Sequence, residues 1–451
     1  MKKLFGTDGI RGNANQGAMT AEMALEIGRA VAFACRETDR DRRHRILIGK
    51  DTRVSGYMLE NALTAGICSM GVDVLLVGPL PTPGIAFATH SMRCDAGVVI
   101  SASHNAYHDN GIKLFSRDGT KFPDAMEAKF ESLVGSDELA KHRATGNDIG
   151  RAKRIDDASG RYIVFCKNTF PDELSLEGLR IAIDTGNGAT YKVAPVILGE
   201  LGAEIVCINN HPNGVNINDN CGSQHTAGLR EKVAETRADL GLAFDGDGDR
   251  LIAVDELGNE LTGDHIIAIC AKDLQERGLL RGNQVVTTVM SNFGFKLAMD
   301  KLKLAHHAAK VGDRHVLEMM KDKDASLGGE ASGHIILSDH HTTGDGIIAA
   351  LQLLAVIKRS GKSLSELSTV MTMAPQMLIN VPVSSKPPLE ELETLTEASK
   401  KAEAELEGTG RVLIRYSGTE PKCRVMVEAA EAEQTRRICT ELAEIVTRCI
   451  G

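Results

Sequence analysis

The chain has 451 residues, of which 42% are hydrophobic, 25% are charged and only 4% are aromatic. This is the composition of an ordinary soluble globular protein, and the length suggests about three domains. The formal net charge of −9 and the absence of tryptophan argue against broad nucleic-acid binding, which needs basic surface and stacking side chains.

Targeting and redox signals are weak along the whole chain. The opening MKKLFGTDG lacks the apolar stretch of a signal peptide, and the longest apolar run, residues 346–357, is too short to span a bilayer. Ten cysteines occur without CxxC pairs or metal-finger spacing, which predicts reduced thiols. We therefore expect a cytoplasmic protein with no membrane and no nucleic-acid partner.

In chain order, a Gly-rich segment containing Arg11 comes first, and a helix is predicted over residues 20–37. A unit of strand, polar glycine-bearing loop, helix and strand follows at residues 45–77. It recurs at residues 179–208 and, more faintly, from residue 284 to a strand before Gly312. This order predicts βαβ construction with largely parallel strand pairing.

The repeats predict three tandem α/β domains, at residues 1–155, 156–255 and 256–370. Beyond them the pattern changes to a strand over residues 376–383, a charged helix over 389–406, two further strands and a final helix. That order predicts a smaller C-terminal α+β domain over residues 371–451. The fold class is α/β with mixed, largely parallel sheets, plus this smaller domain.

A reactive loop is predicted after the buried strand at residues 97–101, where the chain breaks into a small polar segment around Ser103. A turn ending at Gly111 then returns Lys113 towards the same loop. In most loops of this composition the serine hydroxyl only bonds to nearby backbone in a turn or a helix cap, so the local sequence alone does not assign a chemical role to Ser103. A Ser-His hydrolase pair is excluded, because adjacent extended residues point to opposite sides and no GxSxG motif occurs.

The sharpest local signal is the alternation of Asp245, Asp247 and Asp249 with glycines directly after the apolar run at residues 240–244. Alternate positions place the three carboxylates on one side, where they can hold a hard cation such as Mg²⁺. Without a cation they would repel one another. Arg250 stands at the position where an EF-hand loop needs glycine, which argues against an EF-hand. An aspartyl phosphatase, with Asp245 or Asp247 as nucleophile, stays open as an alternative.

Two later loops carry side chains suited to a sugar phosphate. Glu330, Ser332 and His334 alternate in a Gly-rich loop and offer an acceptor, a hydroxyl and an imidazole to a polyhydroxylated ligand. Residues 415–424 offer two guanidiniums, two hydroxyls and an open backbone turn, the groups that bind a phosphate dianion. These are Arg415, Ser417, Gly418, Thr419 and Arg424. No Walker A or GxGxxG motif is present.

Together the motifs resemble the signatures of the α-D-phosphohexomutase family. SASHN at residues 101–105, DGDGDR at 245–250, GEASGH at 329–334 and RYSGTEP at 415–421 match the family's four signatures in order, across essentially the full chain. Four shorter segments, FGTDGIRG, INDNCGS, TTVMSNFG and HTTGDG, most resemble the branch that acts on glucosamine phosphates.

The resemblance implies four domains arranged around a central cleft and a phosphoryl-transfer enzyme. Ser103 would be a phosphoserine, and Asp245, Asp247 and Asp249 would bind one Mg²⁺ per chain that also touches the Ser103 phosphate. The expected reaction converts glucosamine 6-phosphate to glucosamine 1-phosphate through a bound hexose 1,6-bisphosphate, which also activates the enzyme. The product would feed UDP-N-acetylglucosamine and cell-wall precursor synthesis.

It also implies roles for the remaining side chains. Arg11, Lys113 and His334 would lie near proton transfer, and Glu330 and Ser332 would bind sugar hydroxyls. The non-reacting phosphate would be held by Arg415, Ser417, Gly418, Thr419 and Arg424. Arg314 would distinguish the two orientations of the sugar, and Arg250 would also bind the substrate. The chain departs from the family pattern at Ala106, where proline is usual, at Ala331, where a larger residue is common, and at His315, where tyrosine is more usual.

Three alternatives stay open at this point. The first is a mutase of the same class that acts on mannose or glucose phosphates. It stays open because no sequence pattern shows that the protein recognises the 2-amino group of the sugar. The aspartyl phosphatase predicts phosphate release without Ser103, and a metal-dependent sugar-phosphate binder predicts binding without turnover. The expected partner is a small sugar phosphate; a homodimer is compatible with the sequence, which does not fix the oligomeric state.

Overall fold

The structure is a computed structural model that describes residues 4–6, 8–38, 42–417 and 421–451. The chain divides into two compact units. The first comprises Met1–Val289 and His307–Thr369, and the second comprises Met290–His306 and Val370–Gly451. No helix in the described ranges combines the length and apolar character needed to cross a membrane.

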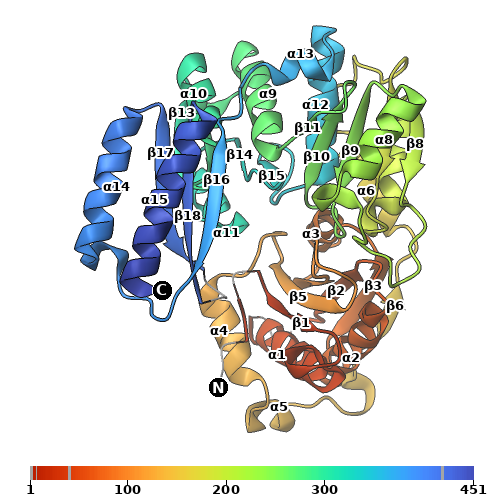
Figure 1. Cartoon of the computed structure of the whole chain (residues 1–451). Helices are drawn as coiled ribbons and strands as arrows, with labels where there is room; N and C mark the ends of the chain where they lie inside the picture. Colours follow the sequence, from red (N-terminus) through yellow and green to blue (C-terminus); the bar gives the residue numbers. More distant parts are fainter. Residues whose placement is uncertain (1–3, 7, 39–41, 418–420) are drawn as a thin grey trace. The chain divides into compact units, whose positions relative to one another are not determined.

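The first unit opens with a six-stranded sheet in the order β1-β5-β4-β2-β3-β6 (Figure 1). β2 runs parallel to β3 and β4, whereas β5 runs antiparallel to β4 and β1. Its strands are β1 (Ile10–Asn13), β2 (Arg45–Lys50), β3 (Asp73–Pro79), β4 (Ala96–Ile100), β5 (Asp109–Ser116) and β6 (Ala152–Arg154).

Helices cover both faces of this sheet. Successive residues of the inner strand β2 point to opposite faces, so the strand packs against helices on both sides. Ile46 and Ile48 belong to the core packed against α1 and α2. On the opposite face a Cβ at Gly49 would lie 2.5 Å from the Ile85 side chain of α3, so that helix packs directly on the strand. The elements are η1 (Gly17–Met19), α1 (Ala21–Thr38), α2 (Ser55–Ser69), α3 (Thr82–Ser91), α4 (Asp124–Leu133), α5 (Asp137–Lys141) and η2 (Gly146–Asp148).

A second sheet follows in the order β11-β10-β9-β7-β8. β7 runs parallel to β8 and β9, and β10 turns back antiparallel to β9, so the carboxyl end of β9 leads into a tight turn. Its strands are β7 (Arg180–Asp184), β8 (Glu204–Ile208), β9 (Leu240–Phe244), β10 (Leu251–Asp255) and β11 (Glu260–Leu261). The helical elements are α6 (Ala158–Lys167), η3 (Ala189–Tyr191), α7 (Val193–Glu200), η4 (Gly222–Gln224) and α8 (Ala227–Thr236).

The third sheet has the order β13-β12-β14-β15, with β12 parallel to β14 and β15 antiparallel to it. Its strands are β12 (Gln284–Thr288), β13 (Ala305–Ala309), β14 (Leu327–Gly329) and β15 (Ile335–Leu337). The accompanying helices are α9 (Gly263–Glu276), η5 (Arg281–Asn283), α11 (Asp313–Lys323), α12 (Gly346–Ser360) and α13 (Leu364–Ser368).

The second unit is built around a three-stranded antiparallel sheet in the order β16-β18-β17. Buried side chains of this sheet and of α14 and α15 form one core. The elements are α10 (Phe293–Leu302), β16 (Gln376–Pro382), η6 (Leu389–Glu391), α14 (Glu393–Leu406), β17 (Gly410–Tyr416), β18 (Lys422–Ala429) and α15 (Ala432–Ile450).

The predicted fold class is confirmed, namely α/β sheets followed by a smaller C-terminal sheet with its helices. One element begins later than expected. The helix predicted from residue 389 starts at Glu393, because Leu392 has φ −88° and ψ 83° and separates it from the turn η6. None of the cysteines in the described ranges is joined to another in a disulfide. The domain limits at residues 155, 255 and 370 stay predictions.

Candidate active site

Ser103 lies in the loop that leaves the buried strand β4, and it is 1% exposed. Its φ of 51° is in the left-handed region, which non-glycine residues adopt only where the surroundings enforce it. The Ser103 N–H donates to Ser101 Oγ at 2.9 Å, and Ser103 Oγ donates to Asp245 Oδ2 at 2.5 Å. The serine hydroxyl therefore faces the acidic loop.

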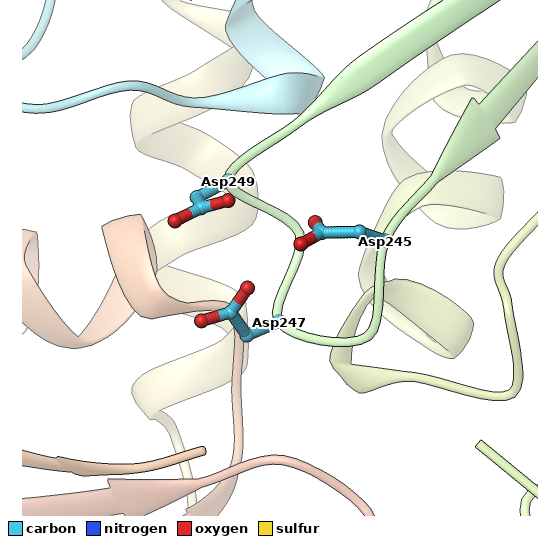
Figure 2. A group of neighbouring side chains, drawn as sticks. All are labelled: Asp245, Asp247 and Asp249. Carbon is cyan, nitrogen blue, oxygen red and sulfur yellow. The ribbon is translucent and has the colours of Figure 1, made fainter. Parts of the chain in front are cut away.

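The acidic loop is the turn between β9 and β10, and Figure 2 shows its three carboxylates turned towards a common space. Gly248 has φ 71°, a conformation that L side chains rarely adopt, and a Cβ there would lie 2.5 Å from Thr190. Ligand atoms of Asp245, Asp247 and Asp249 all lie within 4.8 Å of one another. The alternation of aspartate and glycine thus gathers the carboxylates as the sequence predicted.

The three carboxylates of this loop are buried close to one another. Burial raises the pKa of Asp245 well above its usual value, and the carboxylates of Asp249 and Asp247 raise it further. Asp247 Oδ1 and Asp249 Oδ1 are buried without a hydrogen-bond partner among the described residues. Two unpartnered buried oxygens in a cluster of carboxylates are what a hard divalent cation would bind, so this set fits a Mg²⁺ ion.

Two groups contact Asp247 on its other oxygen. Lys113 Nζ, from β5, donates to Asp247 Oδ2 at 2.9 Å, and Thr82 Oγ1, at the start of α3, donates to the same atom at 2.7 Å. The expected approach of Lys113 to the serine loop therefore occurs through the acidic turn, with Ser103 on Asp245 and Lys113 on Asp247.

A chain of ion pairs extends from Lys113. It links side chains from loops of the first sheet to a side chain from the third. Lys113 Nζ lies 3.3 Å from Asp8 Oδ2; Asp8 also pairs with Arg11 and Lys121; Lys121 Nζ lies 2.5 Å from Asp313 Oδ2. Burial alone would raise the pKa of Asp8, but Lys113, Lys121 and Arg11 outweigh it and hold the pKa well below its usual value.

His334 completes this network from the loop before β15. Its Nδ1 lies 3.6 Å from Asp249 Oδ2, and its Nε2 lies 4.0 Å from Asp313 Oδ2. Burial would lower the pKa of His334, but Asp249 and then Asp313 outweigh it and raise the pKa to about 9. The imidazole is therefore a cation next to the acidic loop.

A cavity of about 610 Å³ opens beside Ser103. Its walls include several of the residues chosen from the sequence: Arg11, Ser103, Asp249, Arg250, Glu330 and His334. Glu330 Oε1 accepts from the Gly312 N–H at 3.0 Å, and Glu330 Oε2 accepts from Ser332 Oγ at 3.2 Å. A polyhydroxylated ligand would meet carboxylate, guanidinium and imidazole groups here.

Arg314 lies elsewhere. Its guanidinium pairs with Asp124 and Glu127 of α4 and donates to the Phe122 carbonyl, so it faces a neighbouring hollow of about 540 Å³. The sequence pattern around residue 314 gave no sign of these acidic partners, because they lie almost 190 positions away.

In the second unit, Arg415 and Arg424 are directly opposite each other on β17 and β18. Burial lowers the pKa of Arg415, and the like charge of Arg424 lowers it further. The Ser417 N–H donates to the Lys422 carbonyl, and Lys386 Nζ donates to the Ser417 carbonyl at 2.7 Å. Two facing guanidiniums beside a turn suit an anion. The predicted residues Gly418 and Thr419 lie outside the described residues.

Asp8, Thr82, Lys121 and Asp313 contact the site but were not selected from the sequence. Asp8 lies in the same Gly-rich segment as Arg11, and Asp313 directly precedes Arg314. Their proximity in sequence to two selected residues could have indicated them. Thr82 and Lys121 follow no local pattern, since their partners Asp247 and Asp8 are 165 and 113 positions away.

Four family models match the chain in order. They are described as phosphoglucomutase/phosphomannomutase alpha/beta/alpha domain I at residues 2–141, domain II at 161–258, domain III at 262–373 and the C-terminal domain at 378–445. Together they cover most of the chain.

Curated relatives are similar over their entire length. The phosphoglucosamine mutase of Geobacter metallireducens is 56% identical over 451 residues, which is 100% of both chains. The phosphoglucosamine mutase of Syntrophus aciditrophicus is 54% identical over the same length and coverage.

Solved structures share the fold at lower identity. A phosphoglucomutase/phosphomannomutase family protein from Burkholderia thailandensis superimposes with a TM-score of 0.81 at 23% identity, covering 99% of this chain and 98% of its own. The N-acetylphosphoglucosamine mutase of Aspergillus fumigatus, in complex with GlcNAc-6P and magnesium, gives 0.65 at 18% identity, covering 99% and 95%.

Proposed function

The chain belongs to the phosphoglucomutase/phosphomannomutase family, and we propose on that basis that it interconverts glucosamine 6-phosphate and glucosamine 1-phosphate, the phosphoglucosamine mutase reaction. The observation that carries the proposal is the buried Ser103 hydroxyl directed at Asp245 within a cluster of three carboxylates. The curated relatives at 54–56% identity support the choice of substrate.

Ser103 acts as the phosphoryl carrier. Phosphoserine passes its phosphoryl group to the free sugar hydroxyl, and the bond between phosphorus and Ser103 Oγ breaks as the bond to the sugar oxygen forms. The sugar hydroxyl gives up its proton and Ser103 Oγ takes one up, so the step as a whole neither gains nor loses a proton. The resulting 1,6-bisphosphate reverses its orientation and returns the other phosphoryl group to Ser103. Enzyme and phosphate content are unchanged over one turnover, which makes the reaction an isomerisation.

Asp245, Asp247 and Asp249, with the Ser103 oxygen, would hold one Mg²⁺. The ion, when bound, supplies positive charge against the negative charge of the phosphoryl oxygens. Thr82 and Lys113 fix the orientation of the Asp247 carboxylate through its Oδ2, which leaves Oδ1 available.

Arg11, Lys113 and His334 supply positive charge and proton transfer around the reacting hydroxyl. Arg11 and His334 line the cavity beside Ser103, and Lys113 lies behind them on Asp247. Glu330 binds sugar hydroxyls in that cavity, where Arg250 contributes a further guanidinium. Ser332, whose Oγ donates to Glu330 Oε2 at 3.2 Å, assists in binding these hydroxyls.

In the second unit, the turn after β17 binds the phosphate that is not reacting. This role is supported by the facing guanidiniums of Arg415 and Arg424 and by the loop of Ser417. Gly418 and Thr419 are included on the basis of the sequence motif. Arg314 stays a candidate for reading sugar orientation. The enzyme works in the cytoplasm on small sugar phosphates, and its oligomeric state, including a homodimer, stays a prediction.

Turnover of defined sugar phosphates tests the proposal. The protein is incubated with glucosamine 6-phosphate, Mg²⁺ and catalytic glucose 1,6-bisphosphate, and ³¹P NMR follows the signals. We expect glucosamine 1-phosphate to accumulate without inorganic phosphate, and glucosamine 6-phosphate to be used faster than mannose or glucose 6-phosphate in competition. Release of inorganic phosphate would instead favour the aspartyl phosphatase, and binding without turnover would favour a sugar-phosphate binder.

A further inference from the structure

We propose that Arg53 and Asn218 are positioning residues that hold Ser103 in its reactive backbone conformation, an inference that rests on the proposed function. They belong to loops of different sheets, Arg53 after β2 and Asn218 after β8. Neither side chain reaches the cavity beside Ser103. We call the pair the serine clamp.

The serine clamp binds the same two carbonyl oxygens from two directions. Arg53 NH2 donates to the Ser103 carbonyl at 3.2 Å and to the Asn105 carbonyl at 2.5 Å. Asn218 Nδ2 donates to these carbonyls at 2.8 and 2.9 Å. The turn between residues 103 and 105 is thereby held by four hydrogen bonds from side chains.

The arginine is itself fixed by a chain of contacts that returns to Ser103. Arg53 is completely buried and pairs with Asp51, whose Oδ2 accepts from Ser101 Oγ at 2.5 Å. Ser101 Oγ in turn accepts from the Ser103 N–H at 2.9 Å. Both polar groups of the Ser103 backbone are therefore bonded into one buried network.

The asparagine connects this network to the acidic loop. The Asn218 N–H donates to the Gly186 carbonyl at 2.9 Å, which anchors its loop to the end of β7. A Cβ at Gly246, between Asp245 and Asp247, would lie 2.6 Å from the Ser103 carbonyl and 2.7 Å from Asn218 Nδ2. The backbone of the acidic loop therefore packs against the serine clamp.

This arrangement explains how Ser103 keeps φ 51° although it carries a side chain. A strained conformation persists only when surrounding contacts over-determine it, and here those contacts direct Oγ to Asp245 at 2.5 Å. Without the serine clamp the residue can relax towards extended backbone, which moves Oγ away from the carboxylates. Misplacement of a reacting atom by about 1 Å costs about 100-fold in rate.

The test compares Asn218→Ala with Asn220→Ala, a matched control. Both asparagines have left-handed φ values, 56° and 51°, in the same loop, but Asn220 is exposed and its side chain donates to its neighbour Asp219 at 3.0 Å. We expect Asn218→Ala to lower kcat about 100-fold while KM for glucosamine 6-phosphate changes less than about twofold, because the cavity residues are untouched. The control should match the wild type in both constants.

A second measurement keeps the inference independent of turnover. In hydrogen–deuterium exchange, amides of residues 101–110 should exchange faster in Asn218→Ala, and in Arg53→Lys if that buried replacement folds, than in the wild type or Asn220→Ala. Equal exchange and equal kcat in the two alanine variants would overturn the inference, as would a rise in KM without a fall in kcat. A wild type that does not isomerise glucosamine 6-phosphate would refute the proposed function instead, and the exchange data would still decide the clamp.

Discussion

Gly246 shows how closely the acidic loop approaches the reactive serine. Any Cβ at this position would stand 2.6 Å from the Ser103 carbonyl, inside the contact distance of the two atoms. We expect Gly246→Ala to push the serine loop away from Asp245 and to lower kcat by about tenfold or more, since small displacements of reacting atoms are costly. Steady-state kinetics measures this directly.

Gly228→Ala in α8 is the control for that substitution. A Cβ at Gly228 has no neighbour within 4 Å, and alanine in a helix is more favourable than glycine by about 1 kcal/mol. The control should therefore keep full activity and unfold at the same or a higher temperature. Full activity of Gly246→Ala would contradict the close packing that we describe.

The sequence predicted the residues of the site best where one short segment carries the whole chemistry. Asp245, Asp247 and Asp249 could be chosen because alternation on one strand end gathers them without help from the rest of the fold. Thr82 and Lys121 could not, since they reach their partners only through the packing of distant elements. Arg314 was chosen for a substrate, and its acidic partners on α4 were invisible in the sequence.

At the scale of elements, His341 ties the loop before α12 to α3. Its Nδ1 accepts from the Thr342 N–H at 2.7 Å, which leaves Nε2 to donate to the Pro83 carbonyl at 3.0 Å. Burial lowers the pKa of His341 to about 4, whereas an unfolded histidine titrates near 6.5. Below pH 6.5 the unfolded chain therefore binds the proton more strongly than the folded chain.

The stabilising effect of neutral His341 is thus complete above about pH 6.5 and is lost as the pH falls towards 4. From pH 7.5 to pH 5 we expect a loss of about 2 kcal/mol in the free energy of unfolding from this group. His341→Gln keeps a donor for Pro83 but cannot titrate, so its loss over the same range should be smaller by that amount. Urea unfolding at the two pH values measures it; parallel losses would count against the buried neutral imidazole.

Strands β17 and β18 carry Arg415 and Arg424 in register, and a phosphate bound at this turn would meet both guanidiniums. We expect Arg424→Gln to raise KM for glucosamine 6-phosphate about 100-fold, because one of the two guanidiniums is lost. Steady-state kinetics measures the change. An unchanged or lower KM would contradict a phosphate site at this turn.

Short strands bounded by glycine were the most predictable elements. Residues 204–208 form β8 as predicted, because an apolar run between two polar turns leaves little choice of ends. The start of α14 was less predictable, since residues 389–392 are helix-like in composition but Leu392 adopts a non-helical conformation. Helix composition does not reveal that single backbone angle.

At the scale of the whole molecule, binding of Mg²⁺ should stabilise one of the two compact units against unfolding and not the other. The carboxylate cluster lies in the first unit only, and multidomain chains unfold in more than one step. Mg²⁺ at about 100 times its Kd should stabilise the first unit by about 2.7 kcal/mol and leave the second unchanged. Calorimetry with and without EDTA tests this, with Asp247→Asn as the variant that should lose the shift. An equal shift in that variant would place the ion elsewhere.

The recurring order of strand, polar loop, helix and strand allowed the overall fold class to be predicted, and the sheets confirm it. The network that surrounds Ser103 was not predictable, because it joins Arg53, Asp51 and Asn218 over separations of 50 to 115 positions. Such contacts depend on how three loops from two sheets meet, which no local pattern records.

The central claim is that Ser103 carries the phosphoryl group, and intact mass followed by peptide mapping tests it most directly. The purified protein is measured before and after incubation with glucose 1,6-bisphosphate and Mg²⁺, with Ser103→Ala treated in parallel. The account predicts one added phosphoryl group on the wild-type peptide that contains Ser103 and none on the variant. An unmodified Ser103 peptide, or an acid-labile phosphate on Asp245 or Asp247, would contradict it.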